Sequence, residues 1–262
     1  MNGSIAAVLL AGCLIHCATI AEAQDIDSVF VETYHVAPDP DGGAAPLVTY
    51  RIYVDLAAGR TLQMVYGNED HQLYLKTTTD FFNDKKHGAK IGDHIPADSL
   101  NAFPLAIDSW LTLGAASDQD LAVPLRLDPD GSRLTCPPYS GAGVKSDNLG
   151  LVPPLPLNRS DGLLRVDSVP PVVGFRMDPG YFGHIRGSVV HTMDGAWAVM
   201  GGTKGPTPEN IVLIAQVSTT GILSYAFNVQ IGLPDGSAVK YVWRDAGDDE
   251  SYHPDLLHGR VP

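Results

Sequence analysis

The chain has few cysteines, and their positions exclude a disulfide framework in the exported protein. The three cysteines are Cys13, Cys17 and Cys136. The first two lie in an N-terminal apolar segment that we expect to be removed, which leaves Cys136 alone. A lone cysteine cannot form an intramolecular disulfide, so the fold must be stabilised by its hydrophobic core.

Positive charge is also scarce. Lys and Arg total 17 against 30 Asp and Glu, which gives a formal net charge of −13 at pH 7. Such a chain repels nucleic-acid phosphates and anionic membranes, so we expect no nucleic-acid partner. Glutamate is rare too, with 5 Glu against 25 Asp. Aspartate is favoured in turns, where its carboxylate bonds nearby backbone, and it is also the ligand type that Ca²⁺ prefers.

Helical periodicity and the common catalytic motifs are missing. No alternation of strands and helices appears, which argues against nucleotide-binding α/β folds. The sequence contains no G-x-S-x-G and no H-E-x-x-H motif, which argues against the common serine hydrolases and zinc proteases. The sequence favours a non-catalytic protein, and it leaves open a hydrolase that uses a pair of aspartate carboxylates.

The N-terminus predicts export. Residues 1–23 contain no Lys or Arg, and an apolar run from Ile5 to Ile20 ends at the small-x-small triplet Ala21-Glu22-Ala23. This pattern indicates a cleaved signal peptide and a secreted or cell-surface protein. Leu10-Ala11-Gly12-Cys13 offers the alternative of a lipid anchor at Cys13. A membrane span is not expected, because the run is short and lacks basic flanks.

Alternation with period two is the main structural signal. In the segment 48–56, Val48, Tyr50, Ile52, Val54 and Leu56 share one face. In the segment 223–231, the odd-numbered residues are all apolar and share one face. Such patterns predict half-buried antiparallel strands. The run Ile211–Val217 predicts a central strand, joined to the next by a hairpin turn at Thr219-Thr220-Gly221.

Together these segments predict about a dozen strands and an all-β fold. The further strand candidates are Ser28–Val36, Arg60–Tyr66, Gln72–Lys76, Ala106–Leu113, Leu121–Leu127, Leu163–Asp167, Gly187–His191, Ala196–Met200 and Ala238–Trp243. Many short strands separated by turn residues are typical of an antiparallel β-sandwich, here jelly-roll-like. At most one short helix is expected, near Thr79–Lys86 or Ala97–Asn101.

The domain organisation follows from composition. We expect one β-sandwich domain over residues 24–245. Residues 128–179 hold nine prolines and predict a long Pro/Gly-rich excursion, because central strands do not tolerate that density. Residues 246–262 read as a mobile acidic tail. Its acidic residues and the imidazoles of His253 and His258 leave a divalent-metal site as the alternative.

Aromatic residues among polar neighbours form the candidate ligand site. Trp110 stands between Asp108 and Thr112, Tyr53 between Arg51 and Asp55, and Tyr74 between Gln72 and Lys76. A flat ring flanked by hydrogen-bonding groups suits a sugar, which stacks its C–H face on the ring. We therefore predict ligand contacts from Trp110, Tyr53, Tyr74 and Asp108. The alternative is that another layer covers this face and makes the rings part of the core.

Two D-P-D-G tetrapeptides form the candidate metal site. They contain Asp39 and Asp41 in one copy and Asp128 and Asp130 in the other. Two carboxylates two residues apart can face one Ca²⁺ ion, and the glycine permits a sharp bend. Neither copy continues into a full calcium loop, so the alternative is a simple turn. Ca²⁺ is the candidate cofactor.

Several stretches resemble a family of uncharacterised secreted β-rich proteins of marine bacteria. The segments that carry the resemblance are VTYRIYVDL with VYGN, TTTDFFN, DSWLTLG, GAWAV and VLIAQVSTTGILSYAFNVQ. The resemblance implies secretion and a β architecture. It transfers no activity, cofactor or catalytic residue.

The sequence as a whole predicts a secreted, non-catalytic β-sandwich that binds an extracellular surface or glycan. Export, acidity, the lack of catalytic motifs and the aromatics on polar strand faces support this expectation. Two alternatives stay open. One is a secreted, glycan-active hydrolase that uses two Asp carboxylates, and the other is a structural envelope or matrix protein.

Overall fold

The structure is a computed structural model of residues 1–262. It describes residues 24–37, 45–84, 86–100, 104–129, 160–176 and 187–261. The predicted signal peptide with Cys13, and most of the predicted excursion, lie outside the described residues.

The described residues form an all-β, sandwich-like fold, as predicted. A central sheet has the order β1 (Ile26–Ala37), β2 (Leu47–Leu56), β11 (Ile211–Thr219), β5 (Trp110–Leu111). A six-stranded sheet has the order β15 (Glu250–Tyr252), β14 (Ala238–Val242), β13 (Asn228–Gly232), β3 (Thr61–Tyr66), β10 (Ala196–Thr203), β8 (Val173–Phe175). A third sheet has the order β16 (Leu257–His258), β12 (Leu223–Ala226), β4 (Leu73–Thr77), β9 (Val189–Thr192). β6 (Asp120–Ala122) and β7 (Leu163–Arg165) form a separate pair.

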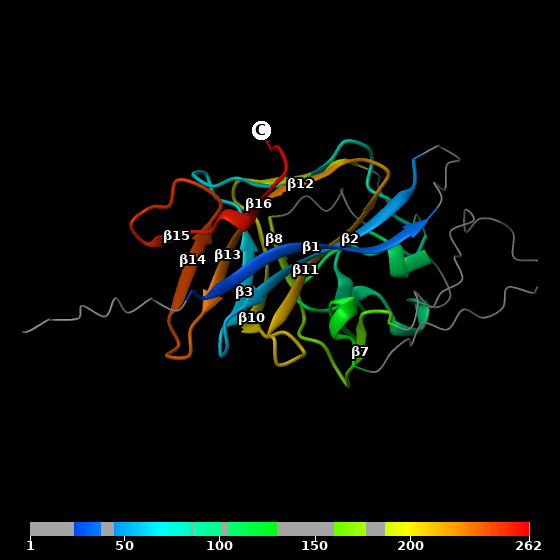
Figure 1. Ribbon diagram of the computed structural model, residues 1–262, viewed down its shortest axis with the longest axis horizontal. Coiled ribbons are helices and arrows are strands. Elements are labelled where there is room, and N and C mark those ends of the chain that lie inside the picture. Colours follow the sequence, from blue (N-terminus) through cyan, green and yellow to red (C-terminus); the bar gives the residue numbers. More distant parts are fainter. Residues whose placement is uncertain are drawn as a thin grey trace, which may run out of the picture.

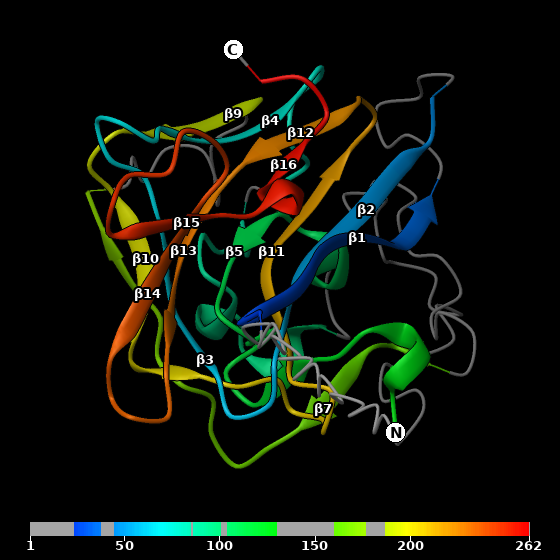
Figure 2. The same cartoon turned by 60° about the vertical axis from the view of Figure 1, so that its left-hand side comes forward.

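The sheets are arranged around one main core. In Figure 1 the six-stranded sheet lies at the left, and β1, β2 and β11 of the central sheet cross the middle of the molecule. Figure 2 shows the third sheet along the top. Neighbouring strands pair antiparallel, except that β14 and β15 run parallel.

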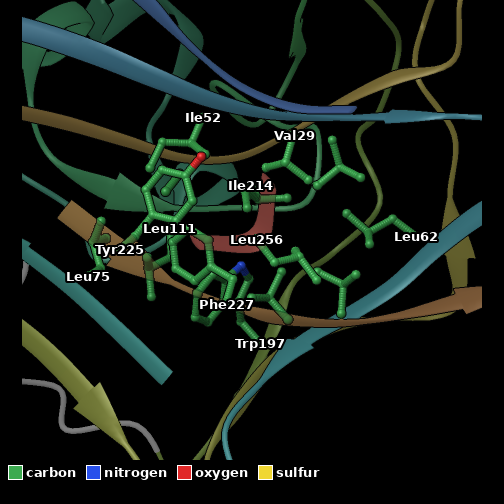
Figure 3. Packing of buried hydrophobic residues seen from close by; sticks show 14 of the residues in the cluster. Val29, Ile52, Leu62, Leu75, Leu111, Trp197, Ile214, Tyr225, Phe227 and Leu256 are labelled. Atoms are coloured by element: carbon green, nitrogen blue, oxygen red, sulfur yellow. The ribbon is translucent and has the colours of Figure 1, made fainter. Parts of the chain in front are cut away.

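The main core draws on all three sheets, as Figure 3 shows. Ile52 of β2, Ile214 of β11, Trp197 of β10 and Tyr225 of β12 meet there. Ile52, Val54 and Leu56 all belong to this core, which confirms the face predicted for segment 48–56. The alternating side chains of β2 thus place one face against the other sheets.

The segment 223–231 is two strands rather than one. β12 and β13 belong to different sheets, and the backbone between them, at Phe227, bonds Leu256 instead of a strand partner. The apolar side chains of both strands still belong to the main core, because their odd-numbered side chains point toward it in both sheets. The predicted hairpin at Thr219–Gly221 is wrong for the same reason: β11 pairs with β2 and β5, and β12 pairs with β4 and β16.

The second face of the central sheet is covered by irregular chain. Residues 91–127 contain the short 3₁₀ helices Gly92–His94, Ala97–Leu100, Pro104–Ile107 and Leu125–Leu127. The strand predicted over Ala106–Leu113 shrinks to Trp110–Leu111, and that over Leu121–Leu127 shrinks to β6 and one 3₁₀ turn. Segment 97–100 is helical only in the 3₁₀ sense, and residues 79–84 contain no helix. Hydrogen bonds to buried side chains replace strand pairing here, so alternation is a poor guide.

The C-terminal segment is part of the fold and not a mobile tail. β15 pairs with β14, and β16 pairs with β12. Leu256 is fully buried in the main core. The Nε2 atom of His253 lies 3.2 Å from the carbonyl oxygen of Ile26 on β1. Of the acidic residues that predicted a solvated tail, Asp248 and Asp249 occupy the exposed loop before β15, and Glu250 begins that strand.

Two strands lie within the Pro/Gly-rich stretch. β7 confirms the strand predicted at Leu163–Asp167. β8 follows Pro170-Pro171 and was not among the predicted strands, yet it forms one edge of the six-stranded sheet. An edge is where a Pro-flanked strand is tolerated, because only one side of its backbone needs partners.

Candidate functional site

Two of the predicted ligand-binding rings are buried. Trp110 is 1% exposed and Tyr53 is fully buried, both in a second cluster between the central sheet and the irregular segment. The Tyr53 hydroxyl donates to the carbonyl oxygen of Val123 at 3.0 Å. These rings therefore form no open surface with Tyr74, and their burial matches the core alternative.

The polar residues around Tyr53 serve internal contacts. Arg51 is 1% exposed and donates from Nε to Oε1 of Gln216 at 2.8 Å and from Nη1 to the carbonyl oxygen of Gly162 at 2.9 Å. Its guanidinium stacks on the Tyr34 ring, 3.5 Å from the ring centre. Gln216 in turn donates from Nε2 to the carbonyl oxygen of Asp108. The network attaches the covering segment to the sheet and leaves no polar group of Arg51 facing solvent.

Asp108 is enclosed as well. Its Oδ1 accepts the Asp84 N–H at 2.8 Å, and its Oδ2 has no hydrogen-bond partner. A Cβ placed on Gly88 would lie 2.7 Å from that Oδ2, so the glycine backbone closes over the carboxylate. Burial raises the pKa of Asp108 well above its usual range, and the neighbouring Asp84 carboxylate adds to the rise. The Gly88 backbone separates this carboxylate from any open cleft, so the Asp84–Asp108 pair gives no support to a two-carboxylate hydrolase.

Tyr74 is the partly exposed member of the predicted set. Its ring stacks on His191 with centroids 4.5 Å apart, and its hydroxyl donates to Gln72. The same Gln72 oxygen lies 3.1 Å from Nε2 of His191. Tyr74 belongs to β4 of the third sheet, so it lies on a different sheet from the open face described below.

The candidate calcium residues are only partly described. Asp39, Asp41 and Asp130 lie outside the described residues. Oδ2 of Asp128 accepts from the backbone N–H groups of Asp161 and Gly162, at 3.0 and 2.9 Å, so this carboxylate joins residue 128 to the start of the β7 segment. Within the described ranges, no three His, Cys, Asp or Glu side chains are grouped so that they could hold a metal ion.

The outer face of the six-stranded sheet carries a continuous row of side chains. Register places one residue from each strand side by side, in the order Val173, Ala198, Met64, Gln230, Lys240, Glu250. We call this set the outer row. Every member is at least partly exposed. Five strand spacings make the row about 24 Å long. It is apolar at the β8 end and polar at the β15 end.

Exposed apolar and aromatic side chains flank the outer row. Phe175, two residues after Val173 on β8, is 49% exposed, and Tyr252, two residues after Glu250 on β15, is 57% exposed. Met200, two residues after Ala198, is 85% exposed. Phe175 and Tyr252 lie on the same side of the sheet as the row, because side chains two apart on a strand share a face.

The polar side chains on this face have polar partners within the protein. Lys240 Nζ lies 3.1 Å from Oδ2 of Asp249. His71 Nε2 lies 2.7 Å from Oε2 of Glu250. Gln230 donates to Gln63 at 2.6 Å. The outer row therefore presents amide groups and compensated charges, which suit a neutral partner better than an ionic one.

Next to the outer row lies a cluster of polar atoms without partners. Tyr66 of β3 and Asn228 of β13 are register partners, and His71 follows in the connection from β3 to β4. Asn228 Nδ2 donates to the carbonyl oxygens of Tyr66 and His71, at 2.9 and 2.7 Å. The Tyr66 hydroxyl, His71 Nδ1 and Asn228 Oδ1 are buried and have no hydrogen-bond partner. Burial raises the pKa of Tyr66, with Glu250 and Asp249 adding to the rise, so its hydroxyl keeps its proton.

Sequence reasoning did not find this face. Phe175, the exposed ring at the β8 end of this face, lies in a Pro-rich stretch with no extended alternation. Glu250 belongs to the segment that was expected to be a mobile tail. Membership of the face depends on pairing between strands far apart in the chain, and alternation within one strand carries no such information.

Among the described residues, the structure has no helix with the length and apolarity needed to cross a membrane. Comparison of the chain with protein-family models, with curated proteins and with solved structures found no match. The resemblance to secreted marine-bacterial proteins stays a prediction.

Proposed function

We propose that the protein is exported and binds an extracellular surface through the outer face of the six-stranded sheet, with a neutral glycan as the partner class. The observation that carries the proposal is the outer row, which crosses all six strands and stays partly exposed along its length. An extended polymer that lies across the strands would contact apolar side chains at the β8 end and amide and charged side chains toward the β15 end.

The ends of the face offer the two kinds of contact that a sugar needs. At the β8 end, Phe175 presents a ring that is 49% exposed. An exposed aromatic ring can stack on the C–H face of a sugar. At the other end, the side chains of Gln230 and Lys240 can take hydroxyl groups.

Charge supports a neutral partner. The chain carries a net charge of −13, which disfavours polyanionic glycans. The ion pair of Lys240 with Asp249 is exposed, and it leaves little unbalanced charge for a polycation at this point of the face. A hydroxyl-rich neutral polysaccharide is neither repelled by the net negative charge nor dependent on an unbalanced charge on this face.

A glycan array together with co-sedimentation on insoluble cellulose, chitin and agarose tests the proposal. Wild type should bind at least one of these polymers, and Phe175→Ala should lower that affinity by about tenfold, the loss expected for one stacked ring. The matched control is Ile222→Ala, another exposed apolar residue, 73% exposed and located in the β11–β12 turn. A wild type that binds nothing, or equal losses in both variants, would contradict the proposal.

A further inference from the structure

Three unpartnered polar atoms from neighbouring residues need an explanation. Buried polar groups are nearly always hydrogen-bonded, and each exception calls for a reason. The Tyr66 hydroxyl, His71 Nδ1 and Asn228 Oδ1 are three such exceptions on residues that Asn228 links, because its Nδ2 donates to the backbone carbonyls of the other two. We call them the polar cluster.

The hydrogen bonds that these residues already make determine whether their unpartnered atoms can donate or accept. Glu250 Oε2 also accepts the Gly247 N–H, at 3.2 Å, so it acts as an acceptor toward His71. His71 Nε2 therefore donates to this carboxylate. Asn228 uses Nδ2 as a double donor, so its free atom is the acceptor Oδ1. The Tyr66 hydroxyl can donate or accept.

The Asn228 acceptor, the His71 ring nitrogen and the Tyr66 hydroxyl match a ligand group that can both donate and accept. We propose that the polar cluster is the anchoring subsite for a hydroxyl group of the glycan that the outer face binds. This inference rests on the proposed function and goes further, because it assigns hydroxyl recognition to Tyr66, His71 and Asn228. An uncharged hydroxyl suits the cluster, because it can donate to Asn228 Oδ1 and accept from Tyr66.

The position of the cluster fits such a role. The register runs from Phe175 through Ala196 to Tyr66 and Asn228. Tyr66 is two strands from Phe175, which is about 10 Å. A glycan stacked on Phe175 would therefore extend over Tyr66. Tyr66 is 6% exposed, His71 is 4% exposed and Asn228 is fully buried, so a ligand can reach the subsite only after part of the structure moves. Entry requires the His71–Glu250 contact to open, and this contact joins a loop to an edge strand.

The substitution Tyr66→Phe tests the subsite with little risk to the fold. It removes a hydroxyl without a partner and keeps the ring, so the urea midpoint of unfolding should stay the same or rise. Affinity for the polysaccharide that wild type binds, among cellulose, chitin and agarose, should fall by about tenfold or more. The matched control is Tyr50→Phe on β2, which should leave binding unchanged.

Each other outcome overturns the inference. If Tyr66→Phe binds like wild type while Phe175→Ala loses affinity, the polar cluster holds only water and the proposed function stands. If the urea midpoint of Tyr66→Phe falls, the hydroxyl has a partner in the folded protein and the premise is wrong. If wild type binds none of the three polymers, the proposed function fails, and this inference fails with it.

Discussion

Two sheet faces in this protein carry aromatic residues among polar ones, and one face is buried whereas the other is exposed. One is the covered face of the central sheet, with Tyr53 and Arg51, and the other is the outer face of the six-stranded sheet, with Phe175 and Gln230. Tyr53 and Arg51 are buried, whereas Phe175 is half exposed. A mixture of aromatic and polar side chains therefore lies in a core in one place and on the surface in the other.

The partners of the polar groups explain the difference. On the covered face, Arg51, Gln216 and Ser218 bond to the backbone of the irregular segment and its neighbours. On the outer face, polar side chains pair with one another, as Gln230 does with Gln63. Polar groups on a strand face can bond to a covering segment or stay accessible to a ligand. Only their hydrogen-bond partners in the folded protein distinguish these two cases.

The largest effect should come from removing the cation on the covered face. Arg51→Met keeps the apolar stem but leaves the acceptors on Gln216 and Gly162 unpaired in the interior. We expect it to lower the free energy of unfolding by about 3–5 kcal/mol. The matched substitution on the outer face, Lys240→Met, breaks only an exposed ion pair and should cost less than about 0.5 kcal/mol. Urea denaturation of both variants measures the difference.

Equal costs for the two variants would break this comparison. A small cost for Arg51→Met would mean that water reaches the covered face and satisfies the free acceptors. A large cost for Lys240→Met would mean that the outer face is also enclosed.

A smaller effect, which depends on pH, should come from Asp108. Because burial raises its pKa in the folded state, the native protein holds this proton where the unfolded chain has lost it. The stabilising contribution is complete below the unfolded pKa and is lost as pH rises through the folded pKa. Asp108→Asn stays uncharged throughout. Its free energy of unfolding relative to wild type should rise with pH, by about 1–3 kcal/mol once wild-type Asp108 is charged.

Chemical denaturation of both proteins from pH 4 to pH 9 measures this difference. Taking the difference between variant and wild type cancels Glu32, whose pKa is also raised by burial. A difference that stays flat or falls with pH would show that the Asp108 carboxylate is charged without penalty in the folded protein.

Much of the fold could be predicted because strand alternation is local. The apolar side of segment 48–56 was assigned correctly, and Ile52 and Val54 lie in the main core. The covering segment 91–127 could not be predicted, because its 3₁₀ turns follow contacts with buried side chains such as Gln216. Alternation shows that a strand has two faces but does not show which face another segment covers.

The candidate site was harder to predict for a related reason. Trp110 and Tyr53 had the expected local pattern, but distant chain covers them. Phe175 and Glu250 had no such pattern, and they reach one face only because β8 and β15 form the two edges of the same sheet. A site made by register between distant strands leaves no signature within any one of them.

Hydroxyl-radical footprinting, with and without bound polysaccharide, tests the central claim most directly. It asks which exposed side chains a ligand shields on the intact protein. The account predicts shielding of Phe175, Met200 and Tyr252, and no change at Ile222 and Leu257, which are exposed on other parts of the molecule. Shielding of Ile222 or Leu257, with Phe175 and Tyr252 left reactive, would contradict it.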